Sequence, residues 1–168
     1  MNLIFIVFAC FFLLRLISLG ISIKNEKRLI REGAVQHGRK VSLLLTLVHI
    51  AYYFSALYEA YSGEISFNVY SYWGVGIMFF AYVMLFYVIY KLRDVWTVKI
   101  YIAPNHRIDR SFLFRTIKHP NYFLNIVPEL IGVAFLCNAW YTLLIGFPIY
   151  VACLGVRIAQ EERVMSEI

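Results

Sequence analysis

Long apolar runs, separated by short polar stretches, set the pattern of this chain. A helix that crosses a membrane needs about 20 mostly apolar residues, and several runs reach or approach that length. They are residues 2–23, 41–61, 69–90, 121–137 and 140–156. The pattern therefore predicts an all-α integral membrane protein, with about five transmembrane helices that form one domain over residues 1–168.

The stretches between these runs are of two kinds. Two short turns, "SGEISFN" at 62–68 and "NA" at 138–139, each join a pair of runs, and the two-residue turn predicts that the last two runs are antiparallel neighbours. The longer stretch at 91–118 alternates apolar and polar residues around 97–102, which predicts a short extended element before Pro104.

The composition excludes an ordinary soluble domain. Hydrophobic residues make up 61% of the chain and charged residues 15%, and the mean hydropathy is +0.69. A small domain keeps much of its surface in water, so side chains this apolar need lipid as their solvent. No basic segment precedes the first run and no small-residue cleavage site follows it, so we expect a retained anchor. The three cysteines lie in apolar runs without a C-x-x-C pair, which predicts buried thiols and no metal site.

Basic residues are confined to one class of connection. Nearly all of the 16 Lys and Arg residues lie in 24–40, in 91–118, or from Arg157 onward, and the two short turns hold none. With five crossings these groups fall on one side, so the positive-inside rule predicts the N-terminus outside and the C-terminus in the cytoplasm. The charges are spread over membrane loops without a nucleic-acid-binding motif, so we expect no nucleic-acid partner.

Two prolines mark the fourth run as unusual. Pro120 suits the first turn of a helix, which places Lys118 and His119 beside free backbone N–H groups that favour an anionic ligand. Pro128 cannot donate a hydrogen bond to the carbonyl of Leu124. We therefore expect a broken turn that faces protein or a wet cavity.

A polar stripe runs along the same segment. Helical spacing puts Asn121, Asn125, Pro128, Glu129 and Gly132 on one face. A carboxylate at membrane depth costs roughly 2.5–3.5 kcal/mol on insertion scales, more than one ordinary hydrogen bond of about 1 kcal/mol returns. Glu129 must therefore face a cavity, a partner charge or a ligand. The alternative to a functional role is a structural polar seam between helices.

Three polar residues of the first two runs have structural interpretations. We expect Arg15 either to snorkel or to pair with an intramembrane carboxylate. His49 is interpreted as an interhelical hydrogen-bond donor, and Glu59 as a side chain that reaches interface water.

The last run ends in "GVRIAQEERVM", with Arg157 and Glu161 one turn apart and Glu162 beside them. One interpretation is a solvated helix end with an i,i+4 ion pair. In the other, the "NA" turn makes the last two runs antiparallel neighbours and brings His119 level with this helix end. A cluster of cations and carboxylates would then form at one shared entrance.

These residues carry a resemblance to a known family. "KHPNY" from Lys118, then Glu129, a second helix, and "RIAQEE" from Arg157 together resemble the isoprenylcysteine carboxyl methyltransferase family of integral membrane enzymes. "NEKRLIREGAV" after the first run is similar to that family's basic loop. The resemblance implies that S-adenosylmethionine binds in a cytoplasm-facing pocket, while a lipophilic acceptor enters from the bilayer. The cofactor-binding residues that it implies are His119, Pro120, Tyr122, Arg157, Glu161 and Glu162.

The overall form is similar to small bacterial members of that family. This implies a multi-pass protein among the lipids of a bacterial cell membrane, functionally linked to a lipid or polyketide synthase. The methyl group would go to an oxygen of an alkylpyrone or other polyketide-type lipid, or to a prenylcysteine-like carboxylate. For catalysis we expect Arg157 or His119 to hold the anion of the acceptor, and Glu129 is a further catalytic candidate.

Two other classes of function remain open. A membrane reductase that acts on a lipid double bond has a very similar H-P-N-Y hairpin but binds NADPH. A non-catalytic membrane protein would use the stripe around Glu129 as a path or a seam. Binding of S-adenosylmethionine or its demethylated product, without binding of NADPH, separates the methyltransferase from both.

Overall fold

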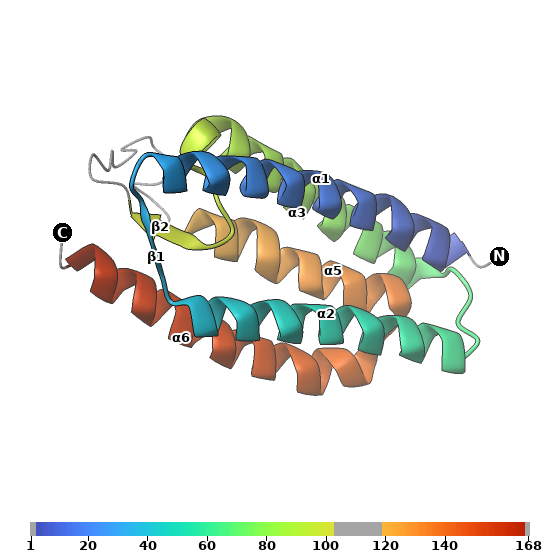
Figure 1. Cartoon of the computed structure of the whole chain (residues 1–168). Helices are drawn as coiled ribbons and strands as arrows, with labels where there is room; N and C mark the ends of the chain where they lie inside the picture. Colours follow the sequence, from blue (N-terminus) through green and yellow to red (C-terminus); the bar gives the residue numbers. More distant parts are fainter. Residues whose placement is uncertain (1–2, 103–118, 167–168) are drawn as a thin grey trace.

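A computed structural model describes residues 3–102 and 119–166 as a bundle of long helices (Figure 1). Two of the helices begin with a π-helical stretch, η2 before α5 and η3 before α6. The helical elements are α1 (Leu3–Arg31), α2 (Arg39–Ser62), α3 (Val69–Leu92), η1 (Arg93–Val95), η2 (Asn121–Ile126), α5 (Val127–Cys137), η3 (Thr142–Gly146) and α6 (Phe147–Ser166). Lys118, Pro104 and the other residues of 103–118 lie outside the described residues.

Within residues 3–102 and 119–166, four helices are long and apolar enough to cross a membrane: Leu3–Arg31, Arg39–Ser62, Val69–Val95 and Thr142–Val164. Asn121–Cys137 is a shorter apolar helix. It lies in the middle of the bundle, with α1 and α3 on one side and α2 and α6 on the other (Figure 1). The expected multi-pass helical membrane protein is therefore supported, while a fifth crossing and the N-out, C-in orientation stay predictions.

The first helix is longer than its apolar run. Residues 24–31 were expected to begin a basic loop, but they form the last turns of α1. Lys, Glu, Arg, Leu and Ile all continue a helix at little cost, so the helix runs past the apolar segment. It gives way to a turn around Gly33, which has a φ of 86° that favours glycine.

A small sheet closes the end of the bundle that carries the C-terminus (Figure 1). Strand β1 (Val35–His37) pairs antiparallel with β2 (Ile100–Ile102), and Gln36 lies opposite Tyr101. The extended element expected around 97–102 is confirmed. Within the described residues, this pair of strands is the departure from a purely helical fold.

The crossing of α3 and α5 depends on two glycines. A Cβ atom added to Gly74 would lie 2.7 Å from the carbonyl oxygen of Gly132, and it would also collide with the backbone nitrogen of Leu136. A Cβ atom on Gly132 would in turn lie 3.0 Å from the backbone nitrogen of Met78. Backbone therefore packs directly against backbone here, as small residues allow in membrane helices.

Gly74→Ala is expected to destabilise the protein, because the new methyl group must push two helices apart. Overpacking of this kind costs typically about 1–3 kcal/mol. Gly76 is a matched control on the same helix, since a Cβ there meets no described atom within 4 Å. Gly76→Ala should be neutral or stabilising, because alanine favours a helix over glycine by about 1 kcal/mol. Thermal unfolding in detergent measures both variants, and equal midpoints would contradict the proposed close crossing.

Candidate functional site

The turn between α5 and η3 is shaped by a left-handed asparagine and held by a side chain of α2. Asn138 adopts a left-handed conformation with φ 51° at the end of α5, which asparagine tolerates well. Glu59 of α2 accepts hydrogen bonds from the backbone nitrogens of Tyr141 (3.1 Å) and Thr142 (2.6 Å). Glu59 therefore satisfies free N–H groups in the first turn of the last helix. That its half-buried side chain also reaches interface water stays a prediction.

The π-helical stretch η2 follows from the proline that comes after it. The ring of Pro128 would crowd the carbonyl of Leu124 in a regular α-helix. The backbone instead takes the wider i→i+5 pattern, and the N–H of Val127 donates to the carbonyl of Tyr122. The broken turn expected before Pro128 is therefore present, in a form that occurs often at functional sites.

At the sheet end of the bundle, the helix hairpin brings the predicted residues together. The hydroxyl of Tyr122 donates to Oε2 of Glu161 at 2.7 Å. His119 lies between two carboxylates, with Nδ1 3.7 Å from Oε2 of Glu161 and Nε2 3.5 Å from Oε1 of Glu162. Its ring stacks on that of Tyr122. Pro120, the residue after His119, is buried. We call these residues, with Arg157, the mouth cluster.

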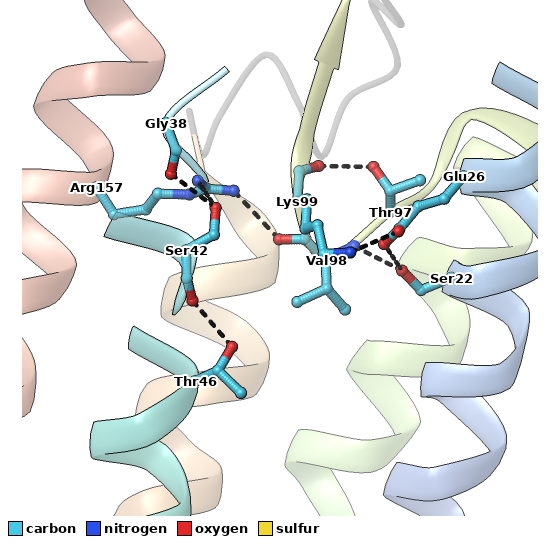
Figure 2. A network of polar contacts seen from close by, with 9 residues as sticks. All are labelled: Ser22, Glu26, Gly38, Ser42, Thr46, Thr97, Val98, Lys99 and Arg157. Carbon is cyan, nitrogen blue, oxygen red and sulfur yellow. Dashed lines mark hydrogen bonds and ion pairs between the residues drawn. The ribbon is translucent and has the colours of Figure 1, made fainter. Parts of the chain in front are cut away.

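Arg157 is the buried centre of the mouth cluster. Its side chain is almost fully enclosed, with 1% of the residue exposed. Nη1 donates to Oγ of Ser42 at 2.6 Å and Nη2 donates to the carbonyl of Val98 at 3.2 Å (Figure 2). Nε donates to the hydroxyl of Tyr122 at 3.4 Å. The interpretation of a solvated helix end is therefore wrong for Arg157. Glu161 pairs with Tyr122 instead.

The groups that hold Arg157 do not neutralise its charge. Its three acceptors are two hydroxyls and a carbonyl, which are neutral groups and leave the guanidinium charge in place. A guanidinium prefers carboxylate or phosphate oxygens as partners. Glu161 is half-buried and Glu162 is exposed, so these carboxylates can bind a cationic or hydroxyl-bearing group beside Arg157. The residues present thus fit a ligand with both charges.

Glu129 belongs to a separate cluster deeper in the bundle. Its carboxylate forms an ion pair with Arg15 of α1, and it accepts hydrogen bonds from the hydroxyls of Tyr53 and Tyr82, the latter at 2.7 Å. Glu129 is fully buried. The structure thus gives it a partner charge and confirms that Arg15 pairs with an intramembrane carboxylate.

The stripe of the fourth segment therefore divides by depth. Glu129 lies about two helical turns beyond Tyr122, and the Arg15 pair holds it as a seam between α1, α2, α3 and α5. Asn125 is also fully buried, and its amide lies 3.4 Å from Oδ1 of Asn121. A catalytic role for Glu129 stays a prediction. His49 bonds Tyr150 of α6 at 3.2 Å, which confirms its interhelical hydrogen bond.

Sequence reasoning missed the partners that hold Arg157. Ser42 is a lone serine at the start of an apolar run, and Val98 takes part through its backbone, so neither gives a sequence signal. Gly38, which lies beside Arg157, also gives no sequence signal. A Cβ atom on Gly38 would collide with Oε1 of Gln160 and lie 3.5 Å from Nη1 of Arg157, and its φ is 63°. The sequence around this glycine does not mark the close approach of α2 to α6 that the structure shows.

Two curated proteins are similar to nearly the whole chain. A protein of Haemophilus influenzae (strain ATCC 51907 / DSM 11121 / KW20 / Rd), described as uncharacterized, is 55% identical over 163 residues, 97% of this chain and 95% of that protein. The uncharacterized protein YpbQ of Bacillus subtilis (strain 168) is 22% identical over 156 residues, 91% and 90% of the two chains. No solved structure matches the chain.

The family comparison covers the part of the chain that holds the mouth cluster. Residues 74–167 match the isoprenylcysteine carboxyl methyltransferase (ICMT) family. This range includes most of α3, all of η2, α5 and η3, and α6. It therefore contains both sides of the hairpin and every residue of the mouth cluster. The chain belongs to the isoprenylcysteine carboxyl methyltransferase family.

Proposed function

We propose that this protein is an S-adenosylmethionine-dependent methyltransferase that methylates an oxygen of a lipophilic acceptor. The observation that carries the proposal is the buried guanidinium of Arg157, held by neutral oxygens beside Tyr122, Glu161 and Glu162. Membership of a family of membrane methyltransferases supports it.

The mouth cluster offers a partner for each polar part of the methyl donor. The donor has a carboxylate, an ammonium group and a ribose with two hydroxyls. Arg157 suits the carboxylate, because charge-assisted hydrogen bonds from a guanidinium are among the strong ones. Glu161 and Glu162 suit the ammonium group or the ribose hydroxyls. The stacked rings of His119 and Tyr122 offer a flat face beside them.

The work left to the protein is positioning. When bound, the donor supplies a methyl group that is already activated on a sulfonium. Holding the two reactants in line can contribute about 7–11 kcal/mol to lowering the barrier. His119, or Arg157 if it does not take the carboxylate of the donor, would hold the acceptor oxygen as an anion before the new O–C bond forms and the S–C bond of the donor breaks. Glu129 would act at one remove, by holding α5 against α1 through Arg15.

The acceptor is proposed to enter from the bilayer. Suitable acceptors are an alkylpyrone or other polyketide-type lipid, whose ring hydroxyl is acidic, and a prenylcysteine-like carboxylate. A synthase of such lipids would then be the functional partner. The sides of the bundle expose large apolar residues on several helices, which fits contact with lipid and with a lipid-like substrate.

Transfer of a labelled methyl group tests the proposal. Membranes that contain the protein are incubated with methyl-labelled S-adenosylmethionine and a lipid extract of the host, and label in the lipid phase is counted. We expect label to exceed that of membranes without the protein at least several-fold, and to fall to background in His119→Ala membranes. Lack of lipid label, together with oxidation of NADPH that requires the protein, would instead indicate the reductase.

A further inference from the structure

The segment between α3 and β2 is tied to the end of α1. Nδ2 of Asn25 donates to the carbonyls of Arg93 (2.9 Å) and Trp96 (2.8 Å), and Asn25 is itself buried. Trp96 is 2% exposed. One side chain of α1 therefore fixes two carbonyls of a short connection that reaches the mouth cluster.

The next contact comes from Ser22, one turn earlier on α1. Its Oγ accepts a hydrogen bond from the backbone nitrogen of Val98 at 3.0 Å and donates to Oε1 of Glu26 at 3.1 Å. The other oxygen of Glu26 binds Nζ of Lys99 at 2.7 Å. Ser22 is fully buried. The ion pair of Glu26 with Lys99 beside it ties α1 to the residue that follows Val98 (Figure 2).

Val98 connects this contact to the mouth cluster. Its N–H binds Ser22 on α1, while its carbonyl accepts a hydrogen bond from Nη2 of Arg157 at 3.2 Å. Figure 2 shows Val98 between the two side chains, which come from opposite sides of the connection. A shift of Val98 away from α1 would therefore move one of the three acceptors that orient Arg157.

We propose that Ser22 is a positioning residue, which holds the guanidinium of Arg157 in its ligand-binding orientation through the backbone of Val98. Glu26 supports it by orienting the hydroxyl of Ser22 and by binding Lys99. The inference rests on the proposed function for its consequence, which is weaker binding of the methyl donor when Ser22 is lost. The link from Ser22 to Arg157 is a property of the ligand-free protein.

The test compares Ser22→Ala with Ser18→Ala. Ser18 is a matched control, because it lies one turn earlier on α1, is 1% exposed, and donates to the carbonyl of Arg15 within the same helix. In detergent, Ser22→Ala should weaken binding of S-adenosylmethionine and of its demethylated product about fivefold to tenfold, the effect of one lost hydrogen bond. Ser18→Ala should bind like the unsubstituted protein.

A readout without ligand separates this inference from the proposed function. In Ser22→Ala, the backbone amide of Val98 and the Nε–H signal of Arg157, assigned by its loss in Arg157→Lys, should exchange with solvent several-fold faster. Ser18→Ala should leave both unchanged. Unchanged exchange in Ser22→Ala, or equal acceleration in Ser18→Ala, overturns the inference. If the unsubstituted protein binds no donor, the proposed function fails, and the exchange rates still decide whether Ser22 holds Arg157.

Discussion

Replacing Glu129 with alanine is expected to destabilise the protein by about 3–5 kcal/mol, the cost of breaking a buried ion pair by removing one partner. The carboxylate is fully buried and binds Arg15, Tyr53 and Tyr82. Its loss would leave a guanidinium at membrane depth without its counter-charge, and two hydroxyls without their acceptor. Thermal unfolding in detergent measures the effect.

The matched control is another Arg–Glu pair of the same chain. Arg28, near the end of α1, pairs at 3.3 Å with Glu32, an exposed residue of the turn that follows. Pairs with a solvent-exposed partner contribute about 0–1 kcal/mol. Glu32→Ala should therefore unfold close to the unsubstituted protein. Arg15→Leu combined with Glu129→Ala should recover part of the loss, because no unpaired charge remains buried. A Glu129→Ala protein as stable as Glu32→Ala would show that the deep pair does not hold the bundle together.

Replacing Arg157 with alanine is expected to reduce affinity for S-adenosylmethionine and its demethylated product by about tenfold to a hundredfold or more. A hydrogen bond to a charged group contributes about 1.5–3 kcal/mol, and each 1.4 kcal/mol is a factor of ten. Arg157→Lys should recover little, since a lysine cannot reproduce the three directions to Tyr122, Ser42 and Val98.

Two further variants serve as comparisons for Arg157→Ala. Arg163 lies on the same helix and is exposed, so Arg163→Ala should bind like the unsubstituted protein. Tyr122→Phe removes the hydroxyl that joins Arg157 to Glu161 but keeps the stacked ring, and it should weaken binding by less than Arg157→Ala. Titration calorimetry on folded protein gives the affinities. Donor binding that survives in Arg157→Ala would remove this residue from the site.

The helices could be predicted from the sequence because lipid leaves few choices. A long apolar run must satisfy its backbone internally, so hydropathy alone located the four long apolar helices of the described residues. The crossing by 121–137 stays a prediction. The pairing of His119 with Glu161 and Glu162 was also predictable, because "NA" is too short to join anything but neighbours. A partner charge was one of three predicted surroundings for Glu129, and an intramembrane carboxylate was one of two predicted environments for Arg15. The structure shows that the two residues pair with each other.

What the sequence could not predict depends on single non-local contacts. The strand at 35–37 pairs with one more than sixty residues away, and no local pattern marks its partner. Ser22 and Ser42 look like the other serines of apolar runs, and their roles depend on where Val98 and Arg157 arrive. The two glycines of "GVG" at 74–76 lack the third glycine of a dinucleotide-binding motif. Gly74 instead allows α3 to pack directly against α5.

The central claim is that the last two helical segments, η2–α5 and η3–α6, form one binding site for the methyl donor at the end of the bundle that carries the sheet. The most direct test is the thermal stabilisation of the detergent-purified, unsubstituted protein by added ligand. A ligand at a hundred times its dissociation constant stabilises the folded state by about 2.7 kcal/mol. We predict this shift with S-adenosylmethionine and with its demethylated product, and none with NADPH. A shift with NADPH alone, or with none of the three, would contradict the account.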